Sequence, residues 1–274
     1  MPLERWLPRA LRQRLFNATP TRLTIHTAGL NRVAAELGVE GVPSFAALLL
    51  GDLTLVTDVP EILGVSADEL RSWTPRDPSR YRSGTRLRYA GPIYARLATP
   101  VPERVERFLE GLRPIVYVAI TSSTAGLVRE VVSALRRLDA RILVAATVHK
   151  LGDLEDEHVL VEQVLPSHEI MPRVDLAVIA GGQGSVQTAV ASGLPFIGIP
   201  LQPEQDANVA LVERQGAARL VPEYASGTGR LTREAREILT DPRYRESARR
   251  LQQIFAVVDG PGAAADAIVE LEGR

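Results

Sequence analysis

The sequence predicts an α/β protein, the larger part of which is built on a parallel β-sheet. Two observations favour this class. From Pro114 onward, short runs of apolar and β-branched residues alternate with segments of helical periodicity, which is typical of βαβ units. Apolar residues make up 45% of the 274 residues and charged residues 24%, the balance of an ordinary globular chain with a sizeable core.

The expected elements follow in order along this part of the chain. Residues 115–120 (IVYVAI) predict the first strand, because β-branched side chains fit a buried, pleated surface. Residues 127–138 predict a helix, since their apolar side chains recur on one face. Further strands are expected at residues 141–147, 158–165, 174–179, 196–199 and 217–221, and further helices at 185–192 and 204–215.

The first hundred residues show this alternation more weakly. Strands are expected at residues 53–59 and 88–93. Residues 1–14 set arginines against tryptophan and leucine, a pattern that fits either a helix packed on protein or a basic amphipathic helix at a membrane. The expected organisation is a first domain at residues 1–98, a linker at 99–113 and a second domain at 114–274.

Composition excludes several classes of function. The chain has no cysteine, which rules out disulfides and thiolate chemistry. Its 32 basic and 33 acidic residues leave a net charge of −1, so no overall field favours nucleic acid. The spacings of its 4 histidines match no metal-binding motif. No apolar run approaches the roughly 20 residues that span a bilayer, so we expect a cytoplasmic protein, with peripheral attachment to a membrane left open.

The most informative segment is a glycine-rich turn between an expected strand and an expected helix. It consists of Gly182, Gln183, Gly184 and Ser185. Glycines let a ligand approach the backbone closely, and the amides at a helix N-terminus favour a phosphate. A tight turn that binds nothing would explain the same residues, so the turn alone leaves both interpretations open.

A carboxylate and a carboxamide follow the next strand. Glu204 and Gln205 come shortly after the strand expected at residues 196–199, at the same edge of the sheet as the glycine turn. A carboxylate accepts hydrogen bonds from sugar hydroxyls, and an amide both donates and accepts. Beside a diphosphate site this pair suits the sugar of a nucleotide-sugar. The alternative is that both residues merely open a helix, where acidic side chains are favourable.

The segment at residues 174–216 resembles the donor-binding signature of GT-B glycosyltransferases related to the UDP-glycosyltransferases, including bacterial natural-product enzymes. It has the order strand, GGQGS, helix, GLP, strand, Pro, EQ and Asn208. The likeness extends over residues 88–274 and includes RYAGPI, PIVYVAI, VLPS and DGPGAAADAIVELE. The resemblance implies a GT-B fold, with a Rossmann-like donor domain at residues 114–274 preceded by the C-terminal part of an α/β acceptor domain at 1–98.

The resemblance also implies three sets of donor-binding residues. The diphosphate would be held by residues of two loops, namely Gly182, Gln183, Gly184, Ser185, Ser122 and Ser123. The sugar would be held by Glu204 and Gln205. The nucleobase and ribose would meet residues at and just after the end of the strand expected at 158–165, and one residue on the helix after the glycine turn, namely Val164, Leu165, His168 and Thr188.

Three positions depart from the common pattern of this family. Ala180 stands where many relatives carry a phosphate-contacting histidine, Thr188 where many carry a ribose-binding glutamate, and Val164 where an aromatic side chain often stacks on the base. These departures indicate a divergent subfamily. They leave open whether the donor carries uridine or thymidine.

The expected function is transfer of a sugar from a UDP- or TDP-sugar to a hydroxyl of a small-molecule or lipid acceptor, with inversion and without a metal or other cofactor. Relatives take their catalytic base, a histidine, from the acceptor domain. No residue of this chain is assigned that role; His26 and His168 are the first to test.

The chain is expected to hold only the tail of an acceptor domain. A truncated start, a split enzyme with a partner chain, and a binding remnant are the three explanations. Apolar surface is expected to be left exposed around residues 45–50 and 53–59 and to favour self-association. The alternative functions are a nucleotide-sugar-binding module or half-enzyme, and a nucleotide-sugar epimerase. A dinucleotide-dependent dehydrogenase is disfavoured, because the loop after the first strand of the second domain reads TSSTAG rather than G-x-G-x-x-G.

Overall fold

The computed structural model describes residues 11, 27–75, 77–81, 84–111, 114–121 and 123–272. The chain divides into two compact units, one made of Met1–Ala90 and Asp266–Arg274, the other of Gly91–Ala265. Among the described residues, no helix combines the length and the apolar character needed to cross a bilayer. The segment at residues 1–14, for which the sequence left two helix types open, lies outside the described residues apart from Leu11.

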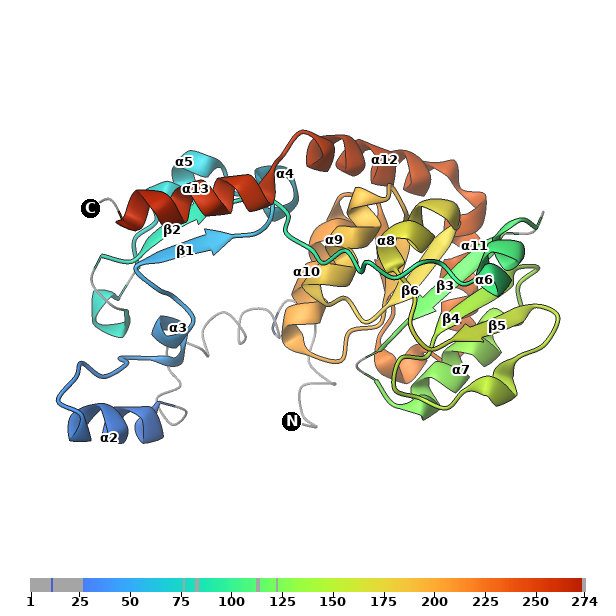
Figure 1. The fold of residues 1–274 in the computed structure, drawn as a ribbon, viewed down its shortest axis with the longest axis horizontal. Helices are drawn as coiled ribbons and strands as arrows, with labels where there is room; N and C mark the ends of the chain where they lie inside the picture. The colour runs from blue at the N-terminus through green and yellow to red at the C-terminus, as the bar shows by residue number, and fades with distance from the viewer. Residues whose placement is uncertain are drawn as a thin grey trace. The chain divides into compact units, whose positions relative to one another are not determined.

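The second unit is built on a six-stranded parallel sheet with the order β5-β4-β3-β6-β7-β8. Figure 1 labels the first four strands of this order. The α/β class and the parallel sheet are therefore confirmed. The strands are shorter than the apolar runs that predicted them. Their bounds are β3 (Ile115–Ala119), β4 (Arg141–Ala145), β5 (Val159–Glu162), β6 (Leu176–Ile179), β7 (Phe196–Gly198) and β8 (Ala218–Leu220).

Helices cover both faces of this sheet. Val116 and Val118 of β3 pack into the same buried cluster as α7 and α11. Tyr117 points to the opposite face, because side chains alternate along a strand, and its hydroxyl lies 2.9 Å from the hydroxyl of Ser167 at the start of α8. The helices and short 3₁₀ turns of this unit are α6 (Glu103–Leu109), α7 (Ala125–Leu135), η3 (Gly152–Leu154), α8 (Ser167–Ile170), η4 (Met171–Arg173), α9 (Gln183–Ala191), α10 (Pro203–Arg214), η5 (Glu223–Ala225), α11 (Gly229–Thr240) and α12 (Pro242–Ala256).

The predicted linker is part of the second unit in the structure. Its helix α6 buries Val105 completely. Glu106 on the same helix forms an ion pair with Arg173 at 2.6 Å, and Arg104 one with Glu162 at 3.1 Å. These contacts attach α6 to the second unit, which begins at Gly91.

The first unit contains a two-stranded parallel sheet of β1 (Leu53–Val56) and β2 (Arg86–Tyr89), in which Leu53 lies opposite Arg86. β2 ends before the expected strand at residues 88–93 does: Gly91 has a φ of +95°, which leaves the extended conformation, and Pro92 has no N–H for a ladder. The last part of helix α13 (Gly260–Glu272) belongs to this unit, where Glu270 forms an ion pair with Arg88 at 2.7 Å. The remaining elements are α2 (Ala28–Glu36), α3 (Phe45–Leu48), α4 (Pro60–Leu63), α5 (Ala67–Arg71) and η2 (Pro78–Arg80).

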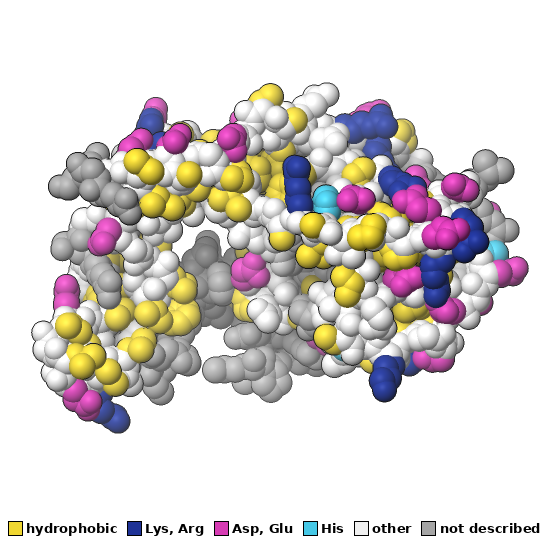
Figure 2. Space-filling model, viewed as in Figure 1, with side chains coloured by type: hydrophobic (Ala, Val, Ile, Leu, Met, Phe, Trp, Pro, Cys, Tyr) yellow, Lys and Arg dark blue, Asp and Glu magenta, His cyan; other side chains and the backbone are white. Residues whose placement is uncertain are grey.

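The first unit leaves much apolar surface exposed, as the yellow side chains over α2, α3 and α13 in Figure 2 show. Helix α2 has no buried residue. Leu49, in the stretch that the sequence singled out, is 64% exposed, whereas the four residues of β1 are half-buried. Exposed apolar surface was expected around residues 45–50 and 53–59, and the structure places most of it on the helices.

Candidate functional site

The order of the strands reverses between β3 and β6. Chain order runs from β3 through β4 to β5 on one side and from β6 through β7 to β8 on the other. Ala119 pairs with Ile179 and Ile179 with Gly198, so β3, β6 and β7 end side by side. Ligands of open α/β sheets bind in the crevice beyond the carboxyl ends of the strands at such a reversal.

Two helices begin at this reversal. After β3 the chain enters α7, where the Thr124 hydroxyl accepts a hydrogen bond from the Leu127 amide at 3.2 Å. After β6 the chain enters α9, whose N-cap residue is Gly182. Because Gly182 has no side chain, nothing of its own occupies the end of α9. The first-turn amides of a helix lack intrahelical partners and carry the positive end of its dipole, so both helix ends favour an anion.

The turn between β6 and α9 is packed tightly against α10. Gly181 has a φ of +91°, which L side chains rarely adopt, and a Cβ there would lie 2.5 Å from Cγ2 of Val209. A Cβ at Gly198 of β7 would lie 2.2 Å from the same methyl group. Both glycines are therefore required by the close approach of Val209 on α10.

Gly182 and Gly184 have no such structural requirement. A Cβ built at either position meets nothing within 4 Å, and neither residue has a positive φ. Gly184 is exposed at the beginning of α9. Since the fold itself would accept a side chain at these two positions, their glycines fit a ligand that approaches the backbone closely.

Glu204 and Gln205 begin α10 but point differently. Glu204 is exposed, and its carboxylate accepts a hydrogen bond from Nδ2 of Asn208. Gln205 is only 6% exposed, and its Oε1 accepts a hydrogen bond from the Leu201 amide at 2.8 Å. The structure therefore offers the Glu204 carboxylate to a ligand, while the oxygen of Gln205 holds the loop before α10.

Two of the expected hydroxyl groups are used within the protein. The Ser123 hydroxyl donates to the Ile120 carbonyl at 2.7 Å. The Thr188 hydroxyl donates to the Gly184 carbonyl at 2.8 Å, and Thr188 is 5% exposed. Ser122 lies outside the described residues.

Of the residues expected to meet the nucleobase and ribose, Val164, Leu165 and His168 follow β5, which β4 separates from β3. Val164 is 52% exposed and Leu165 is buried. Nε2 of His168 lies 3.6 Å from a carboxylate oxygen of Glu169. The chain returns from β5 toward β3 through α8, since Ser167 contacts Tyr117. Burial raises the pKa of Tyr117 to about 12, so its hydroxyl stays protonated at neutral pH.

Sequence reasoning singled out Asn208 as part of a motif without giving it a role. Nδ2 of Asn208 donates to the Gly181 carbonyl at 3.1 Å and also to Glu204. The spacing of four residues from Glu204 was a usable signal, because such pairs lie on one face of a helix. The bond to Gly181, 27 residues away, has no sequence signal.

The described residues include no cluster of three or more histidine, aspartate and glutamate side chains that could hold a metal ion. His26, one of the two histidines proposed for testing as a base, is outside the part of the chain that the structure describes.

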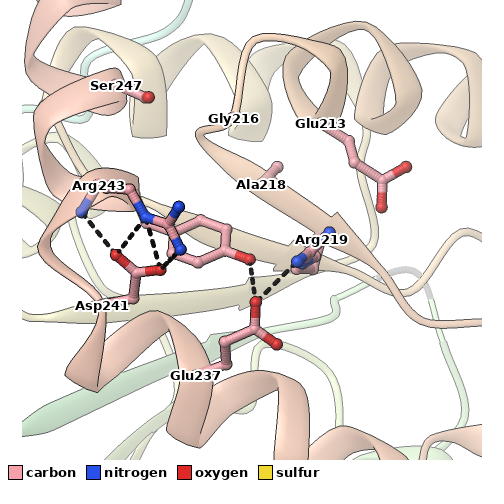
Figure 3. Close-up of a pocket in the computed structure, with 9 residues that line it drawn as sticks. Glu213, Gly216, Ala218, Arg219, Glu237, Asp241, Arg243 and Ser247 are labelled. Carbon is pink, nitrogen blue, oxygen red and sulfur yellow. Dashed lines mark hydrogen bonds and ion pairs between the residues drawn. The ribbon is translucent and has the colours of Figure 1, made fainter.

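A cavity of about 270 Å³ lies elsewhere, beside the amino end of β8 (Figure 3). Its charged groups other than Glu213 bind within the cavity wall: Glu237 accepts from the Tyr244 hydroxyl at 2.6 Å and from Arg219 at 2.7 Å, and Arg243 donates to Asp241 at 2.6 Å. This cavity is at the wrong end of the strands for a ligand of a parallel sheet.

Comparisons with known proteins point to one family. The sequence profile described as UDP-glucoronosyl and UDP-glucosyl transferase matches residues 56–266. Over 168 residues the chain is 33% identical to the 4'-demethylrebeccamycin synthase of Lentzea aerocolonigenes. The matched segment covers 60% of this chain and 39% of the synthase. The chain spans less than half the length of the curated relatives that it matches.

Solved structures agree with the fold. The spinosyn forosaminyltransferase SpnP matches all of this chain and 65% of its own, with a TM-score of 0.69 and 13% identity. The glycosyltransferase VinC, solved in complex with dTDP, matches 97% of this chain and 63% of its own, with a TM-score of 0.66 and 17% identity. The expected GT-B type of fold is thereby confirmed.

Proposed function

The chain belongs to the family of UDP-glucoronosyl and UDP-glucosyl transferases, and from this premise we propose that it binds a nucleotide-sugar and transfers the sugar to an acceptor hydroxyl. The observation that carries the proposal is the meeting of two helix N-termini, those of α7 and α9, at the strand reversal between β3 and β6. This arrangement suits the two phosphates of a nucleoside diphosphate. The exposed carboxylate of Glu204 supplies an acceptor for sugar hydroxyls.

In the proposed reaction, the acceptor oxygen attacks the anomeric carbon of the sugar, and the bond from that carbon to the diphosphate breaks. The electron pair leaves with the diphosphate, whose added negative charge is stabilised by the amides and dipoles at α7 and α9. A single displacement of this kind inverts the anomeric centre. We propose that the helix ends replace a metal ion in this step, and that no other cofactor takes part. The proton of the acceptor hydroxyl goes to a base that is still to be assigned.

The proposed donor is a UDP- or TDP-sugar. The family description names UDP, and VinC was solved with dTDP. The proposed acceptor is a small molecule or lipid with a hydroxyl group. A partner chain or a second copy would cover the exposed apolar residues of the first unit. A nucleotide-sugar epimerase is less well supported, because the relatives carry the names of transferases and a synthase.

The test offers the purified chain UDP- and TDP-sugars with a set of hydroxylated acceptors, and follows nucleotide release and product by mass spectrometry. The proposal is supported if the wild-type chain releases UDP or TDP together with free or transferred sugar, and if Glu204→Ala does not. Binding without release favours the alternative, a binding module that acts with a partner chain. The proposal is overturned if neither nucleotide binds at millimolar concentration and no donor is consumed.

A further inference from the structure

Asn208 joins two parts of the proposed donor site. Its side-chain amide donates to the Gly181 carbonyl at 3.1 Å and to the Glu204 carboxylate. An amide nitrogen carries two hydrogens, so both acceptors can be satisfied at once. One acceptor belongs to the turn that precedes α9, and the other is the exposed carboxylate at the start of α10.

The bond to Gly181 fixes the direction of a backbone amide. The C=O of one residue and the N–H of the next point in opposite directions across a trans peptide. Because the Gly181 carbonyl points to Asn208, the Gly182 amide at the start of α9 points away from it. Gly181 itself packs closely against Val209 and the Gln205 carbonyl of α10, the helix that carries Asn208.

The bond to Glu204 fixes a side chain that would otherwise be mobile. Glu204 is exposed, and an exposed glutamate samples several rotamers. With Oε1 held by Asn208, the carboxylate keeps one position relative to the glycine turn and retains acceptor capacity for a ligand.

We propose that Asn208 is a positioning residue that holds the diphosphate-binding turn and the sugar-binding carboxylate in a fixed relation. The proposal rests on the proposed function, since it assigns Asn208 a part in binding the nucleotide-sugar. Asn208 acts through Glu204 on the sugar and through Gly181 on the diphosphate.

The test measures binding of UDP-glucose and TDP-glucose, and of the free diphosphates, to the full chain by titration calorimetry. Asn208→Ala is expected to weaken binding of the nucleotide-sugar at least tenfold and that of the free diphosphate about threefold. In a Glu204→Ala background, Asn208→Ala should weaken binding of the nucleotide-sugar and of the free diphosphate by only about threefold each. The effect of Asn208 on the sugar through Glu204 is already lost in that background.

Asn208→Asp gives a second readout, the pH dependence of nucleotide-sugar binding, which would not change if Asn208 had a purely structural role. Its carboxylate cannot donate and repels Glu204 at pH 8, so binding of the nucleotide-sugar should be at least as weak as in Asn208→Ala. As the pH falls to 5, a proton shared between the two carboxyl groups restores a bridge. Binding should then recover relative to wild type at the same pH.

Gln252→Ala is the matched control. The Gln252 amide donates to the Ala191 carbonyl at 3.1 Å, at the other end of α9. The variant removes a bond of the same kind and should lower stability without changing nucleotide-sugar binding. The proposed role of Asn208 would be overturned if both Asn208 variants bound the nucleotide-sugar as tightly as wild type, or if Asn208→Ala and Gln252→Ala lost the same affinity for it. Either result would leave the proposed function in place. A wild-type chain that binds no nucleotide-sugar would overturn the proposed function together with that role.

Discussion

Replacing Gly184 by alanine separates the requirements of the fold from those of the ligand. A Cβ at this position meets no atom within 4 Å, so the methyl group should cause no strain. Alanine has a higher helix propensity than glycine, by about 1 kcal/mol in a helix interior, and Gly184 is the second residue of α9. The folded chain should therefore be unchanged in stability or up to about 1 kcal/mol more stable.

Binding should change in the opposite direction. A phosphate oxygen must approach a backbone amide nitrogen to about 2.7–3.2 Å, and a methyl group beside the amide obstructs that approach. Loss of one hydrogen bond to a charged group costs about 1.5–3 kcal/mol, which corresponds to roughly a tenfold to hundredfold higher Kd. Calorimetric titration with UDP and TDP measures this change, and denaturant unfolding measures the stability.

The control variant is Gly181→Ala, at the same turn. There φ is +91° and the Cβ would lie 3.0 Å from the Gln205 carbonyl oxygen and 2.5 Å from Val209. Strain and overpacking should destabilise the fold by about 2–5 kcal/mol. If Gly184→Ala bound UDP and TDP as tightly as wild type, the diphosphate would not lie at the beginning of α9.

Three further changes test other parts of the structure. Glu204→Ala should raise the Kd of the nucleotide-sugar about tenfold or more and leave that of free UDP nearly unchanged; equal losses for both ligands would remove Glu204 from the sugar site. Asp58→Asn should abolish a pH dependence of the free energy of unfolding. Burial raises the pKa of Asp58 from 3.8 to about 6. Its carboxyl group therefore favours the folded state most below pH 4, and the free energy of unfolding falls by about 3 kcal/mol as the pH rises through 6. Denaturant unfolding of both proteins from pH 4 to 7 measures it, and parallel curves would contradict the assignment. Arg245→Met should destabilise the second unit by about 2–4 kcal/mol, because Arg245 donates to the Val174 and Asp175 carbonyls at 3.1 and 2.9 Å; those bonds lie at the amino end of β6, so a reduced UDP affinity in the folded variant would be unexpected.

The sheet of the second unit was predictable because its central strands β3, β6 and β7 are short, continuous apolar runs that are buried on both faces. Tyr117 and Phe196 are completely buried, as such runs require. The edge at which Gly182 and Glu204 lie also followed from the sequence, since parallel strands share one carboxyl end. The order of the strands did not follow, because it depends on pairing between segments far apart in the chain.

The side-chain detail of the site was less predictable. Gln205 and Thr188 have polar side chains in a signature that binds ligands, yet both are buried and bond to nearby backbone. Nothing local distinguishes an inward amide or hydroxyl from an outward one. The packing of Val209 against Gly181 and Gly198 was not predictable either, because it joins residues from three separate elements of the fold. The ion pair of Glu106 on α6 with Arg173 likewise joins segments far apart in the chain, and no local composition reveals it.

In the proposed donor site, the diphosphate binds at the beginning of α9. Backbone amide spectra of the full chain with ¹⁵N-labelled glycine, recorded during a titration with UDP and with TDP, report on this position. We expect saturable shifts of the Gly182 and Gly184 amides, with Gly193 and Gly216 at the far ends of α9 and α10 unaffected. Saturable binding that leaves Gly182 and Gly184 unshifted, or no binding of either nucleotide, would contradict it.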